Sequence, residues 1–341
     1  MNDRSVAPEL RVARFIEKAA AAERVEILRW QRLSGGAIQQ NIALDARVHG
    51  GAFAGEHRWV VRTDAASQVS VSHSRAHEFA LLRAAHEAGV RVARPLWLCE
   101  DGAGPDFFVM DRVPGIAAGH RLTKDDALVA DRAALARELG TNLARIHRIR
   151  PPRPDLAFLG EAPARPAPER IAHYRGCLDA LGSAGVQPVL EWGLRWCELH
   201  APAPVPCVLL HRDYRTGNYL VHEGRLAAVL DWEFAGWGDP VEDIGWFFAR
   251  CWRFAAPARV AGGIGEAGDF LAGYAQGGGG AVREEDTRYW QVMAHIRWAV
   301  IALQQAERHR SGAERSLELA LTAHIVPELE WEILALTSEM P

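Results

Sequence analysis

The chain has 341 residues, of which 49% are hydrophobic and 24% charged, a composition that is ordinary for a globular enzyme with one large domain or two lobes. Its net charge of -4 and its five cysteines without a CxxC pair give no indication of a nucleic-acid-binding protein, a disulfide framework or a zinc site. The first residues form no apolar run of signal-peptide length, and no window is apolar enough to cross a membrane, so we expect a cytoplasmic protein without membrane partners.

The first third of the chain alternates between β-rich runs and glycine turns, which predicts a small sheet. Two further segments have apolar residues at helical spacing. The predicted elements are a helix over 9–24, strands over 25–33, 38–48 and 58–63, a helix over 74–88, and strands over 93–100 and 106–113. The order is therefore five strands with one helix inserted after the third.

From residue 114 onward the pattern becomes mainly helical. The predicted helices cover 125–149, 169–199 and the chain after Pro240, apart from a glycine-rich loop at 276–280. Two short apolar runs, at 207–221 and 226–234, surround polar residues. A strand-rich first part and a larger helical second part predict an α+β fold with two lobes.

Residues 211–218 read HRDYRTGN and follow a short apolar run, which places Asp213 and Asn218 on a loop between strands. Asp231 follows Asn218 by 13 residues (231 − 218). Phosphoryl transfer requires a carboxylate that orients and deprotonates the attacking hydroxyl, and oxygen ligands that hold Mg²⁺ on the phosphates. Two acids and one amide at this spacing supply these groups. The alternative, ordinary surface-loop residues, is disfavoured because spacing, flanking strands and lobe order agree.

The segment 211–218 with Asp231 resembles the catalytic loop and metal-binding aspartate of protein-kinase-like phosphotransferases. The sequence GDPVEDIGW at 238–246 makes it similar, more narrowly, to the phosphotransferase enzyme family. That family includes aminoglycoside phosphotransferases, choline kinases and the kinase domains fused to some acyl-CoA dehydrogenases. The resemblance implies a bilobal protein-kinase-like fold, with a nucleotide-binding lobe over 1–113 and a catalytic and substrate-binding lobe over 114–341.

The resemblance also implies a role for each matching residue. Asp213 matches the catalytic base, Asn218 and Asp231 match the ligands of Mg²⁺, and His211 matches the residue that buttresses the loop. ATP and Mg²⁺ are the implied cofactors.

The sequence patterns that indicate a nucleotide-binding site are weaker. Ser34, Gly35 and Gly36 lie between the first two predicted strands, where kinases place a loop that covers the phosphates, although a plain hairpin turn gives the same pattern. The third strand carries Arg62 where kinases usually have lysine, and Glu78 in the next helix is its candidate partner. The alternatives are a surface Arg62 and a solvated Glu78.

Residues 110–113 end the fifth predicted strand, where the resemblance implies a hinge that holds adenine through its backbone, at Asp111 and Val113. The side chain of Met110 is expected to belong to the core.

The acceptor is expected to be a small molecule with a hydroxyl group, either aminoglycoside-like or a hydroxyacyl-type metabolite. Only seven residues separate Asp231 from Asp239, and no Ala-Pro-Glu follows, which leaves no room for the activation segment of a protein kinase. Asp239 is predicted to cap the next helix, with Pro240 at its first position, and Asp243 to brace the loop. Candidate acceptor-binding residues are Trp246, Arg250, Trp252, Trp290, His295, Arg297, Trp298, Gln304 and His309, with core packing or solvation as the alternative for each.

Two other classes of protein remain open at this point. A non-catalytic nucleotide-binding pseudokinase would account for Arg62 and the unusual glycine loop, but has no need for the full set of Asp213, Asn218 and Asp231. A metal-dependent hydrolase would use the same acids without ATP, and leaves the strand-rich first lobe unexplained. The sequence gives no indication of the oligomeric state.

Overall fold

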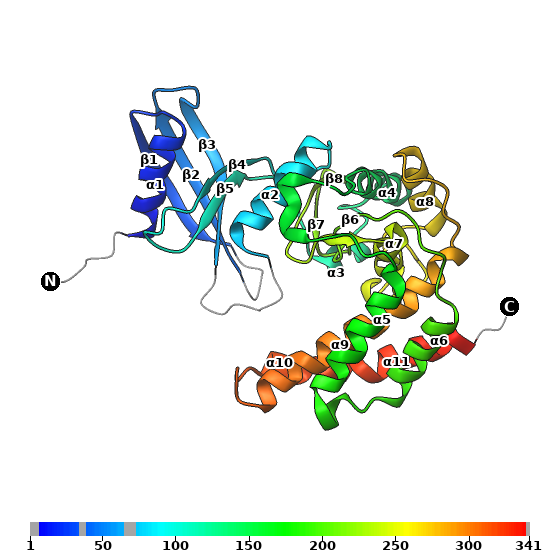
Figure 1. Cartoon of the computed structure of the whole chain (residues 1–341). Helices are drawn as coiled ribbons and strands as arrows, with labels where there is room; N and C mark the ends of the chain where they lie inside the picture. The colour runs from blue at the N-terminus through cyan, green and yellow to red at the C-terminus, as the bar shows by residue number, and fades with distance from the viewer. Residues whose placement is uncertain (1–6, 34–38, 65–72, 339–341) are drawn as a thin grey trace. The chain divides into compact units, whose positions relative to one another are not determined.

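The computed structural model describes residues 7–33, 39–64 and 73–338. The chain forms two compact units (Figure 1). Unit 1 consists of residues 1–114 and 228–234, and unit 2 of residues 115–227 and 235–341. Backbone hydrogen bonds among the described residues tie the second segment to the rest of unit 1, for example from Val229 N to Arg91 O (2.8 Å) and from His73 N to Glu233 O (3.2 Å).

Unit 1 contains an antiparallel five-stranded sheet with strand order β1-β2-β3-β5-β4, as the sequence predicts. Its elements are α1 (Pro8–Ala19), β1 (Arg24–Arg32), β2 (Gln39–His49), β3 (Gly55–Asp64), α2 (Arg75–Glu87), β4 (Pro95–Cys99) and β5 (Phe107–Asp111). The core of the unit lies between α1 and the sheet, where Ile16 packs with Leu44, Trp59 and Val109. Helix α2 follows the third strand, so the predicted element order is confirmed.

The first helix is shorter than the predicted 9–24. It ends at Ala19, and Ala21 takes a left-handed conformation with φ 49°. The N–H of Glu23 then donates to His49 O (2.8 Å), which starts the pairing of β1 with β2. Strand pairing therefore takes these residues from the helix despite the alanine-rich sequence.

Unit 2 is mainly helical, with three short strands of its own and part of a fourth, β8, whose last two residues belong to unit 1. The first half contains α3 (Gly119–Lys124), α4 (Arg132–His147), α5 (Pro166–Ala180), α6 (Pro188–Leu199), β6 (Val208–Leu210), β7 (Tyr219–His222), β8 (Arg225–Val229) and β9 (Gly236–Gly238). The second half contains α7 (Pro240–Phe248), α8 (Ala267–Gln276), α9 (Arg288–Arg310), α10 (Leu317–Thr322) and α11 (Val326–Ser338). Helix α9 packs against α5, α6, α7, α10 and α11 (Figure 1).

Two predicted helices of unit 2 have different bounds in the structure. The helix predicted over 125–149 begins only at Arg132, because the side chain of Asp131 accepts the N–H of Ala134 (2.9 Å) and caps it. The helix predicted over 169–199 is interrupted by a short 3-10 turn at Gly182–Gly185, and Pro188 starts a new helix.

The prediction of helix from Pro240 to the end is wrong for residues 249–266. Within them the structure has one 3-10 turn, Arg250–Trp252, and an isolated bridge between Ala261 and Gly265. Gly262 and Gly263 have φ of 59° and 74°, a region that glycine reaches without strain. These residues leave the helical path and bring a loop back to the catalytic segment, where Gly262 O accepts a hydrogen bond from Thr216 Oγ1 (2.7 Å).

The backbones of helices α4 and α8 approach each other closely because each helix has a glycine at the contact. A Cβ atom on Gly140 would stand 2.0 Å from Phe270 O, and one on Gly273 would stand 2.1 Å from Arg137 O. This close approach brings Tyr274 of α8 to His147 of α4, with 2.8 Å between the hydroxyl and Nδ1. None of the helices in the described ranges is long and apolar enough to span a membrane.

Candidate active site

The loop between β6 and β7 is held by one buried carboxylate of α7. Asp243 accepts the N–H of His211 on Oδ2 and the N–H of Arg212 on Oδ1, both at 2.7 Å. Arg212 has φ 62°, a conformation that is costly for a residue with a side chain. The two hydrogen bonds offset that cost and fix the direction in which the loop leaves β6.

Asp243 is in turn held by a side chain from a distant helix. His147 Nε2 lies 3.3 Å from Asp243 Oδ2, and the other ring nitrogen contacts Tyr274. Burial alone would raise the pKa of the Asp243 carboxyl, but the hydrogen bonds from His147 and the loop hold that pKa below its ordinary value. Neither His147 nor Tyr274 was predicted from the sequence, since neither lies in a recognisable motif.

Asp213 has three side-chain donors on its carboxylate. Oδ1 accepts from Trp246 Nε1 and from Arg215 Nε, each at 3.0 Å, and Oδ2 accepts from Asn218 Nδ2. Asn218 Nδ2 also donates to the backbone oxygen of Asp213 (3.0 Å), and the N–H of Asp213 donates to His211 Nδ1 (3.2 Å). The structure therefore brings together His211, Asp213 and Asn218 within unit 2.

Within unit 1, Arg62 joins two acids that are far apart in the sequence. Its Nη2 lies 2.6 Å from Glu78 Oε1 and 3.1 Å from Asp231 Oδ1. Burial would lower the pKa of this guanidinium, but Glu78 and Asp231 raise it above its ordinary value. The pairing of Arg62 with Glu78 was predicted, whereas the contact with Asp231 was not.

The remaining predicted nucleotide residues have different outcomes. Ser34, Gly35 and Gly36 lie outside the described residues. Asp111 ends β5, where its N–H donates to Arg94 O (3.0 Å) and its carboxylate contacts Arg94 Nε (3.0 Å). The N–H of Val113 has no hydrogen-bond partner among residues 7–33, 39–64 and 73–338.

The model of the phosphotransferase enzyme family matches residues 29–279, which is more than half of the chain. The chain belongs to this family. The match runs from β1 to the loop after α8 and includes both groups of residues described above. The fold prediction is confirmed by the same result and by the solved structures that resemble this one.

Relatives of this family member include two kinds of protein. Acyl-CoA dehydrogenase family member 10 of Mus musculus is 30% identical over 181 residues, which cover 51% of the chain and 16% of that protein. The viomycin phosphotransferase of Streptomyces vinaceus is 30% identical over 168 residues, covering 46% of the chain and 55% of that enzyme. The chain thus spans only about a sixth of the length of the dehydrogenase relative.

Two solved structures have the same fold at low sequence identity. A Ralstonia eutropha protein assigned to the aminoglycoside phosphotransferases has a TM-score of 0.75 and 19% identity, with 97% of this chain and 98% of that one covered. Aminoglycoside phosphotransferase APH(4)-Ia, in a ternary complex with AMP-PNP and hygromycin B, has a TM-score of 0.59 and 15% identity, with 96% and 99% covered.

The helix that follows the candidate metal ligand has the predicted cap. Asp239 is its N-cap residue and accepts the N–H of Val241 (2.9 Å), and Pro240 occupies the first helical position. Asp243 braces the loop, as predicted. Of the candidate acceptor residues, Trp290 and His295 are core residues, with 2% and 1% of their surfaces exposed.

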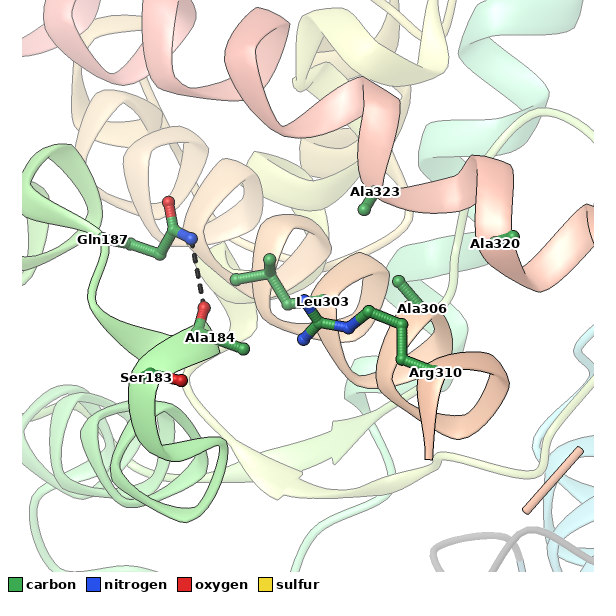
Figure 2. Close-up of a pocket in the computed structure, with 8 residues that line it drawn as sticks. All are labelled: Ser183, Ala184, Gln187, Leu303, Ala306, Arg310, Ala320 and Ala323. Atoms are coloured by element: carbon green, nitrogen blue, oxygen red, sulfur yellow. Dashed lines mark hydrogen bonds between the residues drawn. The ribbon is translucent and has the colours of Figure 1, made fainter. Parts of the chain in front are cut away.

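A cavity of about 250 Å³ lies elsewhere in unit 2 and contains none of the predicted site residues. Figure 2 shows its lining around the C-terminal part of α9, with Gln187 Nε2 donating to Ala184 O (3.1 Å). Most of the lining is apolar, and the one charged residue, Arg310, forms an ion pair with Glu307. The cavity lining is Ser183, Ala184, Gln187, Leu303, Ala306, Arg310, Ala320 and Ala323.

Two buried groups of unit 2 have opposite effects on the pH dependence of stability. Burial lowers the pKa of His295 to about 4, from 6.5. As the pH falls, this histidine is therefore protonated in the unfolded chain before it is protonated in the folded one. The free energy of unfolding then decreases as the pH falls from about 6.5 to about 4. Burial raises the pKa of Asp239 to about 6, from 3.8, and Glu242 adds to the shift. This group makes the free energy of unfolding decrease as the pH rises from about 4 to about 6.

We expect single substitutions to separate these effects. His295→Gln keeps the contribution of Asp239 to the pH dependence, so the free energy of unfolding will decrease as the pH rises from 4 to 6. Asp239→Asn keeps the cap and leaves the His295 contribution, so stability will rise from pH 4 to 6.5. Each slope corresponds to about 3 kcal/mol over its window. Urea midpoints between pH 4 and 7 measure both, and parallel profiles for the two variants would contradict the assignment.

Proposed function

We propose that this chain transfers the γ-phosphoryl group of ATP, with Mg²⁺, to a hydroxyl group of a small molecule. The observation that carries the proposal is the fixed carboxylate of Asp213, which accepts hydrogen bonds from Trp246, Arg215 and Asn218. Its loop is held by Asp243, which accepts the N–H of His211. Membership in the phosphotransferase enzyme family supports the reaction class. The related APH(4)-Ia structure contains AMP-PNP, which supports ATP as the phosphoryl donor.

The chain's own residues have distinct parts in this reaction. Asp213 orients the acceptor hydroxyl and accepts its proton as the oxygen forms a bond to the γ-phosphorus, while the bond from that phosphorus to the bridging oxygen breaks and ADP leaves. The donors on Oδ1 keep the carboxylate from rotating away. Arg62 binds phosphate oxygens through its guanidinium, and its Nε is buried without a partner among the described residues.

The donor atoms of Asn218 and Asp231 suit Mg²⁺. Asn218 directs its Nδ2 protons to Asp213, so its carbonyl oxygen faces away from that carboxylate. The side chain of Asp231 keeps 35% of its surface exposed. Mg²⁺ is a hard cation that is usually bound through one or two carboxylates of the protein. No group of three or more His, Cys, Asp or Glu side chains that could hold a metal occurs in the described ranges. When bound, Mg²⁺ neutralises charge on the phosphates.

Asp231→Ala is expected to remove the Mg²⁺ dependence of nucleotide binding, because it deletes a metal ligand. Calorimetric titration with ATP in the presence of Mg²⁺ or EDTA measures the difference. In the wild type we expect at least about tenfold tighter binding with Mg²⁺, equal to about 1.4 kcal/mol. The matched control is Asp126→Ala, an exposed aspartate of unit 2 that pairs with Arg132. An unchanged Mg²⁺ effect in Asp231→Ala would rule out the metal role.

Phosphate transfer from Mg²⁺-ATP to a panel of hydroxylated acceptors tests the function directly. The panel contains aminoglycosides, choline, sugars and hydroxyacyl thioesters, with Asp213→Ala as the control. Transfer that disappears in the variant supports the proposal. Tight binding of ATP without transfer or hydrolysis would instead favour a pseudokinase, the alternative that Arg62 in place of lysine raises.

A further inference from the structure

The two oxygens of the Asp213 carboxylate accept different numbers of hydrogen bonds within unit 2. Oδ1 accepts two, from Trp246 Nε1 and from Arg215 Nε, each at 3.0 Å. Oδ2 accepts one, from Asn218 Nδ2. A carboxylate has about four lone-pair sites, two on each oxygen. Donors from the described residues therefore use both sites on Oδ1, and the remaining site, where a further donor can bind, lies on Oδ2.

The two donors on Oδ1 are each held by a contact between a guanidinium group and an indole ring. Arg297, from α9, lies 4.2 Å from the ring centre of Trp246. Arg215 lies 4.5 Å from the ring centre of Trp252, and the two rings are themselves in contact, with 5.0 Å between their centres. Cation–π contacts are stronger where water is excluded, and only 3% of the surface of Trp246 is exposed. Packing thus fixes the direction of both N–H groups.

Arg297 also contacts the backbone of the catalytic loop. Its Nη1 donates to the backbone oxygen of Arg212, the residue before Asp213. One side chain of α9 therefore holds both the indole that donates to Oδ1 and the peptide that carries the carboxylate. In the part of the chain that the structure describes, the carboxylate of Asp213 accepts no hydrogen bond from Arg297 itself, so Arg297 acts on it through these two neighbours.

We propose that Arg297 is a positioning residue for Asp213. Arg297 holds the indole of Trp246, which together with Arg215 occupies Oδ1, so that Oδ2 accepts the proton of the acceptor hydroxyl. The hydroxyl oxygen bonds to the γ-phosphorus as its proton moves to Oδ2, and the bond from that phosphorus to the bridging oxygen breaks and releases ADP. The roles of base and acceptor rest on the proposed function, whereas the arrangement of the three side chains does not.

Nuclear magnetic resonance of the indole N–H groups tests the arrangement without any reaction. The chain has 12 tryptophans, and the signal of Trp246 is identified by its loss in Trp246→Phe. We expect this signal to shift upfield, and its proton to exchange faster with water, both in Asp213→Ala, which deletes the acceptor, and in Arg297→Gln. Arg297→Lys should keep most of the wild-type shift, because an ammonium group also binds the face of an indole. An unchanged Trp246 signal in either folded variant overturns the proposal.

Steady-state kinetics with an acceptor from the panel measure the effect on transfer. Arg297→Gln and Trp246→Phe should each lower kcat at least about tenfold, because each weakens a hydrogen bond that orients the charged base. KM for the acceptor and affinity for Mg²⁺-ATP should stay within about twofold. Arg297→Lys should recover most of the lost kcat. A raised KM for the acceptor at unchanged kcat in Arg297→Gln would mean that Arg297 binds the acceptor instead, which contradicts the proposal.

The double variant shows whether Arg297 acts through the indole. In the Trp246→Phe background, Arg297→Gln should lower kcat by less than about threefold, because the hydrogen bond that it supports is already absent. A loss as large as in the wild-type background would show an independent route and contradicts the proposal.

The matched controls are Arg195→Gln and Trp331→Phe, at exposed positions of α6 and α11. Both should leave kcat and the Trp246 signal unchanged, and circular dichroism confirms that every variant is folded. Failure of the proposed function is distinguishable from failure of this inference. It would appear as an absence of transfer by the wild type while the Trp246 signal still responds to Asp213→Ala and Arg297→Gln.

Discussion

Asp213→Asn is expected to reduce phosphate transfer by about 10²–10⁴-fold, because the amide no longer accepts the proton of the attacking hydroxyl. The substitution keeps the shape of the side chain, and its remaining oxygen still accepts hydrogen bonds from Trp246 and Arg215. Affinity for Mg²⁺-ATP should stay within about twofold, since Asp213 is not a proposed metal ligand. Single-turnover transfer and nucleotide titration measure the two quantities separately.

The control for this experiment is Asp126→Asn, which makes the same chemical change at an exposed position. Transfer in Asp213→Asn at close to the wild-type rate would show that this carboxylate is not the base. A parallel loss of nucleotide affinity and stability would point to a collapsed loop rather than to the loss of proton transfer.

Asp243→Asn is expected to destabilise the protein by about 3 kcal/mol or more, because it removes the charged acceptor of a buried hydrogen-bond network while the donors remain. The carboxylate accepts from His211 N, Arg212 N and His147, and an amide has only one accepting oxygen. Its NH₂ group would face at least one of these donors. Arg212 would then lose a bond that holds its left-handed backbone.

Urea unfolding at pH 7 measures this loss, with Asp286→Asn as the control at an exposed ion pair with Arg283. We expect the control to stay within about 0.5 kcal/mol of the wild type. If Asp243→Asn also stays within about 0.5 kcal/mol of the wild type, the loop does not depend on this carboxylate.

The parts of the fold that were predictable are those in which the signal is local. Strands with glycine turns gave the element order of unit 1, and the spacing of His211, Asp213 and Asn218 placed them on one loop. The cap at Asp239 was equally local, since proline follows it at once. Membership in the family was predicted from the same short segments and is confirmed.

The parts that were missed depend on contacts between distant segments. His147 reaches Asp243 across 96 residues, and Arg62 reaches Asp231 across 169. No periodicity records such a pair, because packing decides which faces meet. The loop over 249–266 was predicted as helix, and its left-handed residues Phe254, Gly262 and Gly263 are seen only in the structure.

The chain order of unit 1 has a consequence for how the protein is made. Arg62, Glu78 and the sheet leave the ribosome early, but Asp231 follows 169 residues after Arg62. Since domains form as their residues are synthesised, the nascent sheet carries a buried arginine with one of its two acidic partners missing until most of the chain has been translated. Completion of the first unit therefore requires synthesis of the chain through residues 228–234, which follow the catalytic loop of the second unit.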